Sequence, residues 1–220
     1  MTDDFFETNV AQFKHEFPSI SEIDIASKNS LYCQGESNSH VFWIKSGIVK
    51  LSYLTVQGTE VTIALIKKGE VLGFLPNHPE PHTMEETAQA IGNVQCYQMS
   101  HHDFKILLLQ HPQLLWPVFE KTYARKQNIE HKLRTILTQP VEMRLATTLL
   151  ELADMFGIEC SHGYALEIHL TQQDVADLIG ASRSVVSTLL NNFRSNGILD
   201  YTRDQICIND TALTNAYRSK

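Results

Sequence analysis

The sequence has 220 residues, 43% of them hydrophobic and 20% charged, which is the composition of a globular protein with one large or two small domains. It contains no apolar run long enough to cross a membrane, and its start, Met-Thr-Asp-Asp-Phe-Phe, lacks the basic residues of a signal peptide. We therefore expect a cytoplasmic location and no membrane partner. The formal net charge of −7 argues at first sight against nucleic acid as a partner, unless positive charge gathers on one face.

The first half of the chain has the pattern of an antiparallel β-roll. Between Ile25 and about Met99, glycines 35, 47, 58 and 69 recur every eleven or twelve residues. Short apolar runs lie between them at 41–44, 48–53, 61–66 and 94–97, and Gln57-Gly58 is a plausible hairpin turn. Short helices are predicted on either side, at 4–17 and at 102–109, the second begun by a Ser100 cap.

A long helix is predicted from Pro112 to about Leu137, because proline is tolerated in the first turn of a helix. The pattern favours a parallel coiled-coil homodimer, and the alternative is a surface helix packed on its own roll. The next segment, Thr138-Gln-Pro140, breaks the helix and makes a natural hinge before an amphipathic helix at 141–156. Spacings of four and three residues over three heptads define the seam of the long helix, and the polar Thr122 and Lys126 would loosen the pairing in its middle. The seam residues are Leu115, Phe119, Thr122, Lys126, Ile129, Leu133 and Ile136.

The C-terminal third contains two helices joined by a tight turn. Thr171 and Asp174 form the pattern of a capping box at the start of the first helix. Gly180 ends this helix, because a residue without a Cβ turns the chain there at no steric cost. Ser182 caps the second helix. Apolar residues predicted to face inward are Val175, Leu178 and Ile179 on the first helix and Val185, Val186, Leu189, Leu190 and Phe193 on the second.

The spacing of small and apolar residues in this pair is that of a helix-turn-helix, which places its second helix in the DNA major groove. Ala176 allows two helices to cross closely, Gly180 follows after four residues and Val186 after six more. The alternative is a helical hairpin with a solvated polar face, but such a face would normally carry Glu and Lys. The outward positions of the second helix hold hydrogen-bonding residues suited to bases and phosphates: Arg183, Ser184, Ser187, Thr188 and Asn191.

Two further features support binding to double-stranded DNA. After Asn196-Gly197, the segments 198–201 and 205–208 alternate like two short strands about a Thr-Arg-Asp turn, which predicts a wing. Between Ala181 and Asn196 the chain carries Arg183 and Arg194 and no acids, so the docking surface is locally positive. Such a modest basic face predicts weak non-specific binding and a need for a dimer.

The cysteines and histidines leave alternatives open. Cys33, Cys96, Cys160 and Cys207 form no C-x-x-C pair, so free thiols are expected, with a redox pair only if the fold brings two together. Histidines at 78, 82, 101 and 102 fit a polar surface loop better than a metal or haem site. We therefore expect no metal.

Nearly the whole chain resembles the CRP/FNR superfamily of bacterial transcription regulators. The resemblance implies an α+β fold: a cyclic-nucleotide-binding-like β-roll sensor (residues 1–110), a dimerisation helix with a hinge (111–139) and a winged helix-turn-helix (140–220). Segment 156–163 looks most like the cyanobacterial global nitrogen regulator subgroup. The motifs that carry the resemblance are Gln34-Gly35-Glu36, Gly47, Gly69-Glu70, Gly73, His111-Pro112 and Leu170-Thr171 through Leu190.

The resemblance implies roles at the DNA. Arg183 would read a guanine, and Thr171, Gln172 and Ser182 would hold phosphates. The family often has Glu directly after this arginine and a basic residue four positions beyond that, where this chain has Ser184 and Thr188. The half-site is therefore expected to differ from that of the cyclic-AMP receptor. RNA polymerase is an expected further partner.

The resemblance also bears on the effector. Cyclic-nucleotide binders of the family hold the phosphate with an arginine, but this chain has Glu86 there, beside Glu85, and carboxylates repel a phosphate. Cyclic AMP is therefore not expected. The nitrogen-regulator subgroup holds 2-oxoglutarate partly through an Arg and a Glu five residues apart, but its further arginine aligns with Met84 here. A small anion such as 2-oxoglutarate would then contact Gly73, Phe74, Leu75, Arg125 and Glu130, unless the last two are simply solvated charges.

The sequence thus predicts a dimeric, sequence-specific transcription regulator and not an enzyme. One alternative is a regulator that binds DNA without any effector. The other is a metal-dependent cupin-like enzyme, which shares the roll but needs an H-x-H pair that the sequence lacks.

Overall fold

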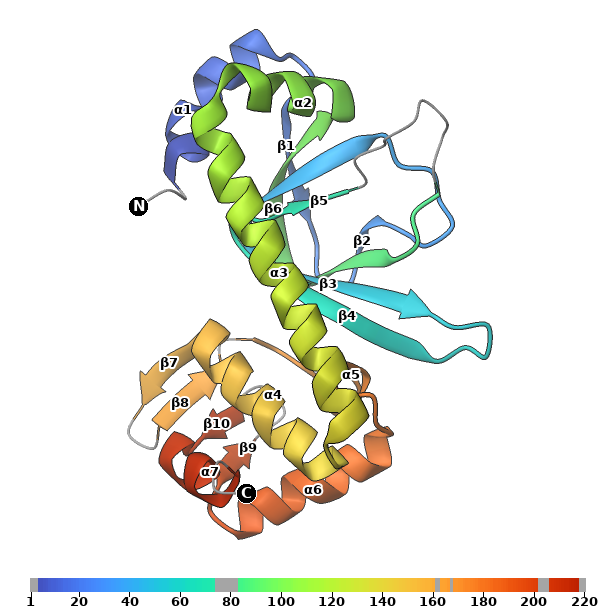
Figure 1. The fold of residues 1–220 in the computed structure, drawn as a ribbon, viewed down its shortest axis with the longest axis vertical. Helices are drawn as coiled ribbons and strands as arrows, with labels where there is room; N and C mark the ends of the chain where they lie inside the picture. The colour runs from blue at the N-terminus through green and yellow to red at the C-terminus, as the bar shows by residue number, and fades with distance from the viewer. Residues whose placement is uncertain (1–3, 74–82, 161–162, 167, 202–205, 218–220) are drawn as a thin grey trace. The chain divides into compact units, whose positions relative to one another are not determined.

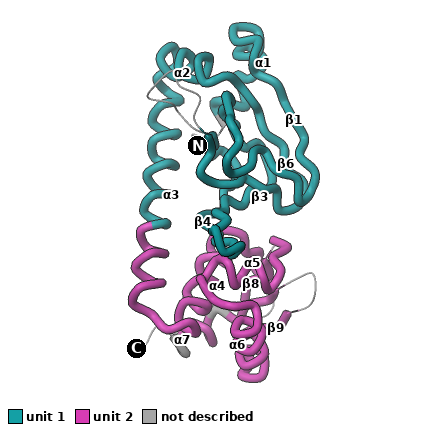
Figure 2. The backbone as a smooth tube through the Cα atoms, turned by 90° about the vertical axis from the view of Figure 1, so that its right-hand side faces the viewer, with its two compact units in different colours: residues 1–129 teal, residues 130–220 magenta. Residues whose placement is uncertain are grey.

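The computed structural model of the chain describes residues 4–73, 83–160, 163–166, 168–201 and 206–217. It divides into two compact units, residues 1–129 and 130–220 (Figure 2). The long helix α3 (Pro112–Thr138) contributes residues to both units. The predicted α+β class, with a β-roll, a long helix and a C-terminal helix-turn-helix with a small sheet, is confirmed. The three-part domain division stays a prediction.

Unit 1 is built on a six-stranded antiparallel sheet (Figure 1). Its main path runs β1-β6-β3-β4, and β2 and β5 pair with β6 and β3. Helices α1 (Asp4–Glu16) and α2 (His101–Gln110) lie together at one end of this roll. The strands are β1 (Ser21–Ile25), β2 (Ser30–Tyr32), β3 (His40–Leu54), β4 (Glu60–Ile66), β5 (Val71–Leu72) and β6 (Thr87–Ser100).

Gly47 does not end a strand, although the sequence pattern places two separate strands on either side of it. Segments 41–44 and 48–53 belong to the single strand β3, whose register with β6 shifts between Ile44 and Ile48. Gly47 has a φ of +84°, and a Cβ on it would lie 2.4 Å from the carbonyl oxygen of Asn93. The glycine is therefore needed for a bulge that keeps two long strands paired.

Two apolar cores hold unit 1 together. One lies within the roll, around Phe42, Ile44 and Ile66. The other packs α1, α2 and the start of α3 against the sheet, and in it the rings of Phe6 and Trp43 stack with centroids 4.3 Å apart. The aromatic residues of α1 thus fix this helix to the roll.

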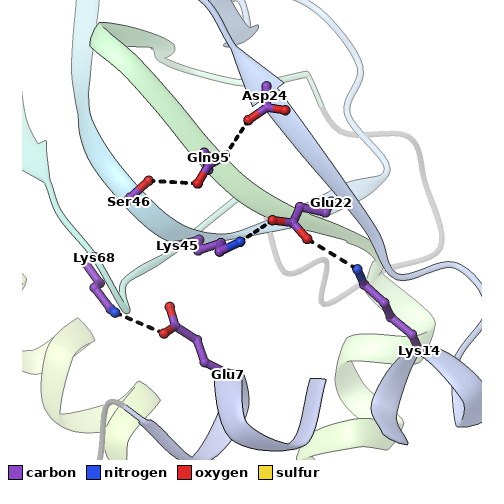
Figure 3. Close-up of polar contacts among 8 residues, drawn as sticks. All are labelled: Glu7, Lys14, Glu22, Asp24, Lys45, Ser46, Lys68 and Gln95. Carbon is purple, nitrogen blue, oxygen red and sulfur yellow. Dashed lines mark hydrogen bonds and ion pairs between the residues drawn. The ribbon is translucent and has the colours of Figure 1, made fainter. Parts of the chain in front are cut away.

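Polar contacts on the surface also connect α1 with the sheet (Figure 3). Glu22 of β1 pairs with Lys14 of α1 and with Lys45 of β3, and Lys68 pairs with Glu7 of α1 at 3.0 Å. The hydrogen bond from Lys45 is the main reason that the pKa of the Glu22 carboxyl lies below its ordinary value. Exposed pairs of this kind contribute little to stability, so the apolar contacts carry the attachment.

Unit 2 begins in α3 and continues with α4 (Val141–Phe156), which coincides with the predicted helix. Helices α5 (Gln172–Ile179) and α6 (Arg183–Ser195) follow. The sheet has the order β7-β8-β10-β9, where β9 (Leu199–Tyr201) and β10 (Ile206–Ile208) are the predicted wing strands. The turn predicted at 202–204 lies outside the described residues. Sequence reasoning missed β7 (Gly157–Cys160), β8 (Gly163–Leu166) and α7 (Asp210–Tyr217).

Among the described residues, no helix is both long and apolar enough to span a lipid bilayer.

The bulge at Gly47 gives a stability prediction. Gly47→Ala is expected to lower the free energy of unfolding by more than about 2 kcal/mol, since its Cβ adds a clash with backbone to an unfavourable φ. Gly58→Ala is the matched control, because Gly58 also has positive φ (+80°) but its Cβ would meet nothing within 4 Å. It should cost about 1 kcal/mol. Urea denaturation measures both, and equal losses would show that the close approach at Gly47 does not matter.

Candidate DNA interface and effector pocket

The turn between α5 and α6 is fixed by caps on both helices. Thr171 accepts a hydrogen bond from the Asp174 backbone N–H at 3.1 Å, and Asp174 accepts one from the Thr171 backbone N–H at 2.9 Å. This is the predicted capping box. Gly180 ends α5 in the left-handed region, with φ +62° and ψ +48°, and the Ser182 side chain caps α6. These three local predictions are confirmed.

Arg144 of α4 braces the same turn, and sequence reasoning missed it. Its Nη1 atom donates to the carbonyl oxygens of Ile179 and Gly180, at 2.8 and 3.3 Å. Those carbonyls lie at the C-terminal end of α5, where a helix leaves acceptors unsatisfied and favours a positive charge. Arg144 is therefore a positioning residue for the two helices.

Burial separates the two faces of α6. Val186, Leu190 and Phe193 are buried, and Ala176 of α5 is completely buried, as the crossing of the helices requires. Val185 was predicted to face inward, and this is wrong, because 42% of its surface is exposed. It lies one position before Val186 and so falls beyond the edge of the apolar stripe.

The predicted outward positions of α6 form a polar face. Ser187 is half-buried, whereas Arg183, Ser184, Thr188 and Asn191 are exposed. Ser184 Oγ lies 3.0 Å from Ser182 Oγ, and the Thr188 hydroxyl donates to the Ser184 carbonyl at 3.1 Å. Thr171 is exposed and Gln172 half-buried at the start of α5. The structure thus gathers the predicted DNA-contacting residues on α6 and on the N-terminal end of α5.

The wing strand β9 is tied to α6. The Tyr201 hydroxyl donates to Asn191 Oδ1 at 2.9 Å, and Arg194 pairs with Asp200 at 2.9 Å. The Arg194 guanidinium also lies 5.6 Å from the centre of the Tyr201 ring. Asp200 therefore neutralises Arg194 locally, so that Arg183 supplies more of the positive charge of this face than the sequence indicates.

Unit 1 contains a pocket of about 420 Å³ beside β5 and the start of β6. Gly73 and Arg125 of the predicted effector site both line it, whereas Phe74 and Leu75 lie outside the described residues. Glu130 is exposed, and it is not among the described residues that line the pocket. The lining residues are Val71, Gly73, Thr83, Met84, Glu85, Glu86, Phe104, Val118, Thr122 and Arg125.

Charge in the pocket is mixed. Arg125 donates through Nη1 and Nη2 to the carbonyl oxygen of Val71, at 3.1 and 3.2 Å. The Tyr32 hydroxyl donates to Glu86 Oε1 at 3.0 Å. Burial, reinforced by the nearby Glu86 carboxylate, raises the pKa of Tyr32 far above its ordinary value, so the phenol remains a neutral donor. Glu86 therefore has the Tyr32 hydroxyl as a hydrogen-bond donor, and the backbone of β5 fixes the position of the Arg125 guanidinium.

Among the residues that the structure describes, no group of three His, Cys, Asp or Glu side chains could hold a metal ion. His78 and His82 lie outside those residues. All four cysteines are free thiols, and two of them, Cys160 and Cys207, come together.

Both units match known protein families. Residues 143–213 match the Crp-like helix-turn-helix domain, and residues 23–111 match the cyclic nucleotide-binding domain. The global nitrogen regulator of Synechocystis sp. is 26% identical over 202 residues, which are 91% of this chain and 89% of the relative. The anaerobic regulatory protein of Bacillus subtilis is 24% identical over 169 residues, which are 77% of this chain and 71% of the relative.

Solved structures share the fold along most of the chain. A CooA variant from Carboxydothermus hydrogenoformans gives a TM-score of 0.78 at 20% identity, covering 97% of this chain and 94% of that one. FixK2 from Bradyrhizobium japonicum gives a TM-score of 0.74 at 20% identity, covering 89% and 96%. The two domain matches and the similarity to the regulators above show that the chain belongs to the CRP/FNR family of DNA-binding transcription regulators, which are not enzymes.

Proposed function

We propose that the chain binds a two-fold symmetric DNA site as a homodimer and that a small anionic effector in the unit 1 pocket regulates it. The observation that carries the DNA-binding part is the exposed polar face of α6, on a helix whose opposite face is buried and whose start is capped. Such a helix fits the major groove, and a dimer would read two half-sites about one helical turn apart. RNA polymerase is the expected partner at the promoter.

Specific roles follow from the positions on this face. Arg183 is the first residue of α6 and is exposed, so its guanidinium is available for a bidentate contact with guanine. Ser184, Ser187, Thr188 and Asn191 offer further groups to base edges. The N-terminal ends of α5 and α6 present Thr171, Gln172 and Ser182 where phosphates would be held.

Exposed apolar side chains on α3 support a dimer. Trp116 and Phe119 are 63% and 55% exposed, and Leu115 and Leu133 of the predicted seam are exposed as well. A neighbouring side of the helix packs into the core of unit 1 through Leu114. Ile136 is half-buried in unit 2, near Gly180, so the last member of the predicted seam is already partly used within the chain.

The pocket supports a small effector other than cyclic AMP. Arg125 can pair with one carboxylate, while Glu85 and Glu86 would repel a phosphate near them. Met84 offers no charge where the subgroup has its further arginine. The similarity to global nitrogen regulators makes 2-oxoglutarate the effector to test first. Glu130, which lies outside the described lining, stays a predicted contact.

DNA binding is tested by selecting bound sequences from a random duplex pool at fixed salt. We expect a palindrome to be enriched, and Arg183→Ala to weaken binding by about 1–3 kcal/mol per half-site. Arg183→Lys keeps the charge but loses the fork of donors, so it should lose discrimination at one base pair and retain non-specific binding. Lys105→Ala removes an exposed charge on α2, in unit 1, and is the control that should change neither the enriched sequence nor the affinity. Failure to enrich any sequence, with or without cell metabolites, would refute this proposal.

The homodimer is tested by sedimentation velocity. Phe119→Asp places a charge in the proposed seam and should convert a dimer to a monomer at micromolar concentration, because a buried unpaired carboxylate is strongly unfavourable. Val56→Asp is the matched control: Val56 is 96% exposed in the turn between β3 and β4. A wild-type monomer, or a dimer that survives Phe119→Asp, would contradict the seam.

The effector is tested by thermal denaturation with added metabolites. At about one hundred times its Kd, 2-oxoglutarate should stabilise the wild type by about 3 kcal/mol. Arg125→Ala should abolish the shift, whereas Arg134→Ala, which removes an exposed cation from the same helix, should retain it. A shift with cyclic AMP would contradict the charge argument. Stability and DNA affinity that no metabolite changes would favour the effector-independent regulator.

A further inference from the structure

Two of the four cysteines meet in the sheet of unit 2. Cys160 ends β7 and Cys207 is the middle residue of β10, 47 positions later. Their sulfur atoms lie 3.2 Å apart, and both residues are free thiols. A disulfide needs about 2.05 Å, so the two sulfurs would have to approach by only about 1 Å.

The register of the sheet explains why the sulfurs can meet although β8 lies between their strands. Cys160 pairs with Gly163, and Cys207 pairs with Ala165, so all four residues share one face of the sheet. The two β8 residues on that face are the smallest available. No bulky side chain therefore stands between the cysteines, and their side chains converge above β8.

We propose that Cys160 and Cys207 form a reversible intramolecular disulfide when the protein meets a small-molecule disulfide as oxidant. One cysteine thiolate attacks the oxidant, forms a mixed disulfide and releases one thiol. The second cysteine then attacks the protein sulfur of the mixed disulfide, forms the Cys160–Cys207 bond and releases the second thiol. The cysteine pair loses two electrons and two protons, and the oxidant gains them as two thiols.

A small oxidant has access to the pair. Cys207 is only half-buried and lines a surface pocket of about 410 Å³, together with Arg194 and Asp200. The pKa of the Cys207 thiol is raised to about 11, mainly by burial. The neighbouring Cys160 and, to a smaller extent, Asp200 act in the same direction. Cys207 is therefore a neutral thiol at neutral pH, so we expect the bond to form slowly compared with an exposed, acidic thiol pair.

The bond would enclose the helix-turn-helix. The segment between Cys160 and Cys207 contains α5, α6 and β9. Closing this loop removes conformations from the unfolded chain, so the oxidised protein should unfold at a higher temperature than the reduced one. The pair is thus a modification site that acts on the stability of unit 2, whichever DNA sequence or effector the protein binds.

The test uses the reduced full-length protein incubated with oxidised glutathione. Remaining thiols are then alkylated under denaturing conditions, and intact mass and peptide mapping locate the bonds. The wild type should lose two of its four thiols, show a Cys160–Cys207 peptide within one chain and melt at a higher temperature, and dithiothreitol should reverse all three changes.

Variants separate this pair from the other cysteines. Cys33→Ser should form the same bond, because Cys33 lies in unit 1. Cys160→Ser should show no internal bond and no rise in melting temperature, with circular dichroism checking that it is folded. Four thiols retained in the wild type, a bond that involves Cys33 or Cys96, or a bond between two chains would each overturn the proposal.

Discussion

The turn between α5 and α6 is the constraint on which the DNA-binding unit depends. A recognition helix must keep one face buried while the other stays open, and this requires two helices to cross closely at a fixed angle. Complete burial of Ala176 permits the close crossing, and the left-handed backbone of Gly180 permits the sharp turn. The Arg144 side chain then holds the two carbonyl oxygens that the turn leaves unsatisfied. Each of the three contributions solves a different physical problem, so none replaces another.

The charged side chains of the unit 1 pocket are separate from the apolar packing that holds the roll together. The roll depends on apolar packing and on the paired strands β3 and β6, and neither involves the side chains of Glu85, Glu86 or Arg125. If the pocket binds an anion as proposed, exchanging its charges would change which anions are tolerated without disturbing this packing. Tyr32 connects the two, since its ring belongs to the core while its hydroxyl donates a hydrogen bond to Glu86.

Local signals in the sequence predicted local structure well. The capping box at Thr171, the end of α5 at Gly180 and the bounds of α4 depend on residues within a few positions of one another, and all are confirmed. Gly47 misled because a glycine between two apolar runs usually marks a turn, whereas here it forms a bulge inside one strand. Val185 was mispredicted because it lies beyond the edge of the apolar stripe of α6, which is centred on Val186 and Leu190.

Features that depend on distant residues were not predictable in the same way. Arg144 contacts Ile179 only because α4 packs against α5, and strands of four residues such as β7 leave too short a pattern to recognise. The Cys160–Cys207 pair depends on the pairing of β8 with both neighbours, which no spacing in the sequence encodes. The sequence nevertheless carries its precondition, because a larger residue at Gly163 or Ala165 would stand on the shared face between the sulfurs. Once the strand register is known, such a pair can be sought where two cysteines on outer strands face small residues on the strand between them.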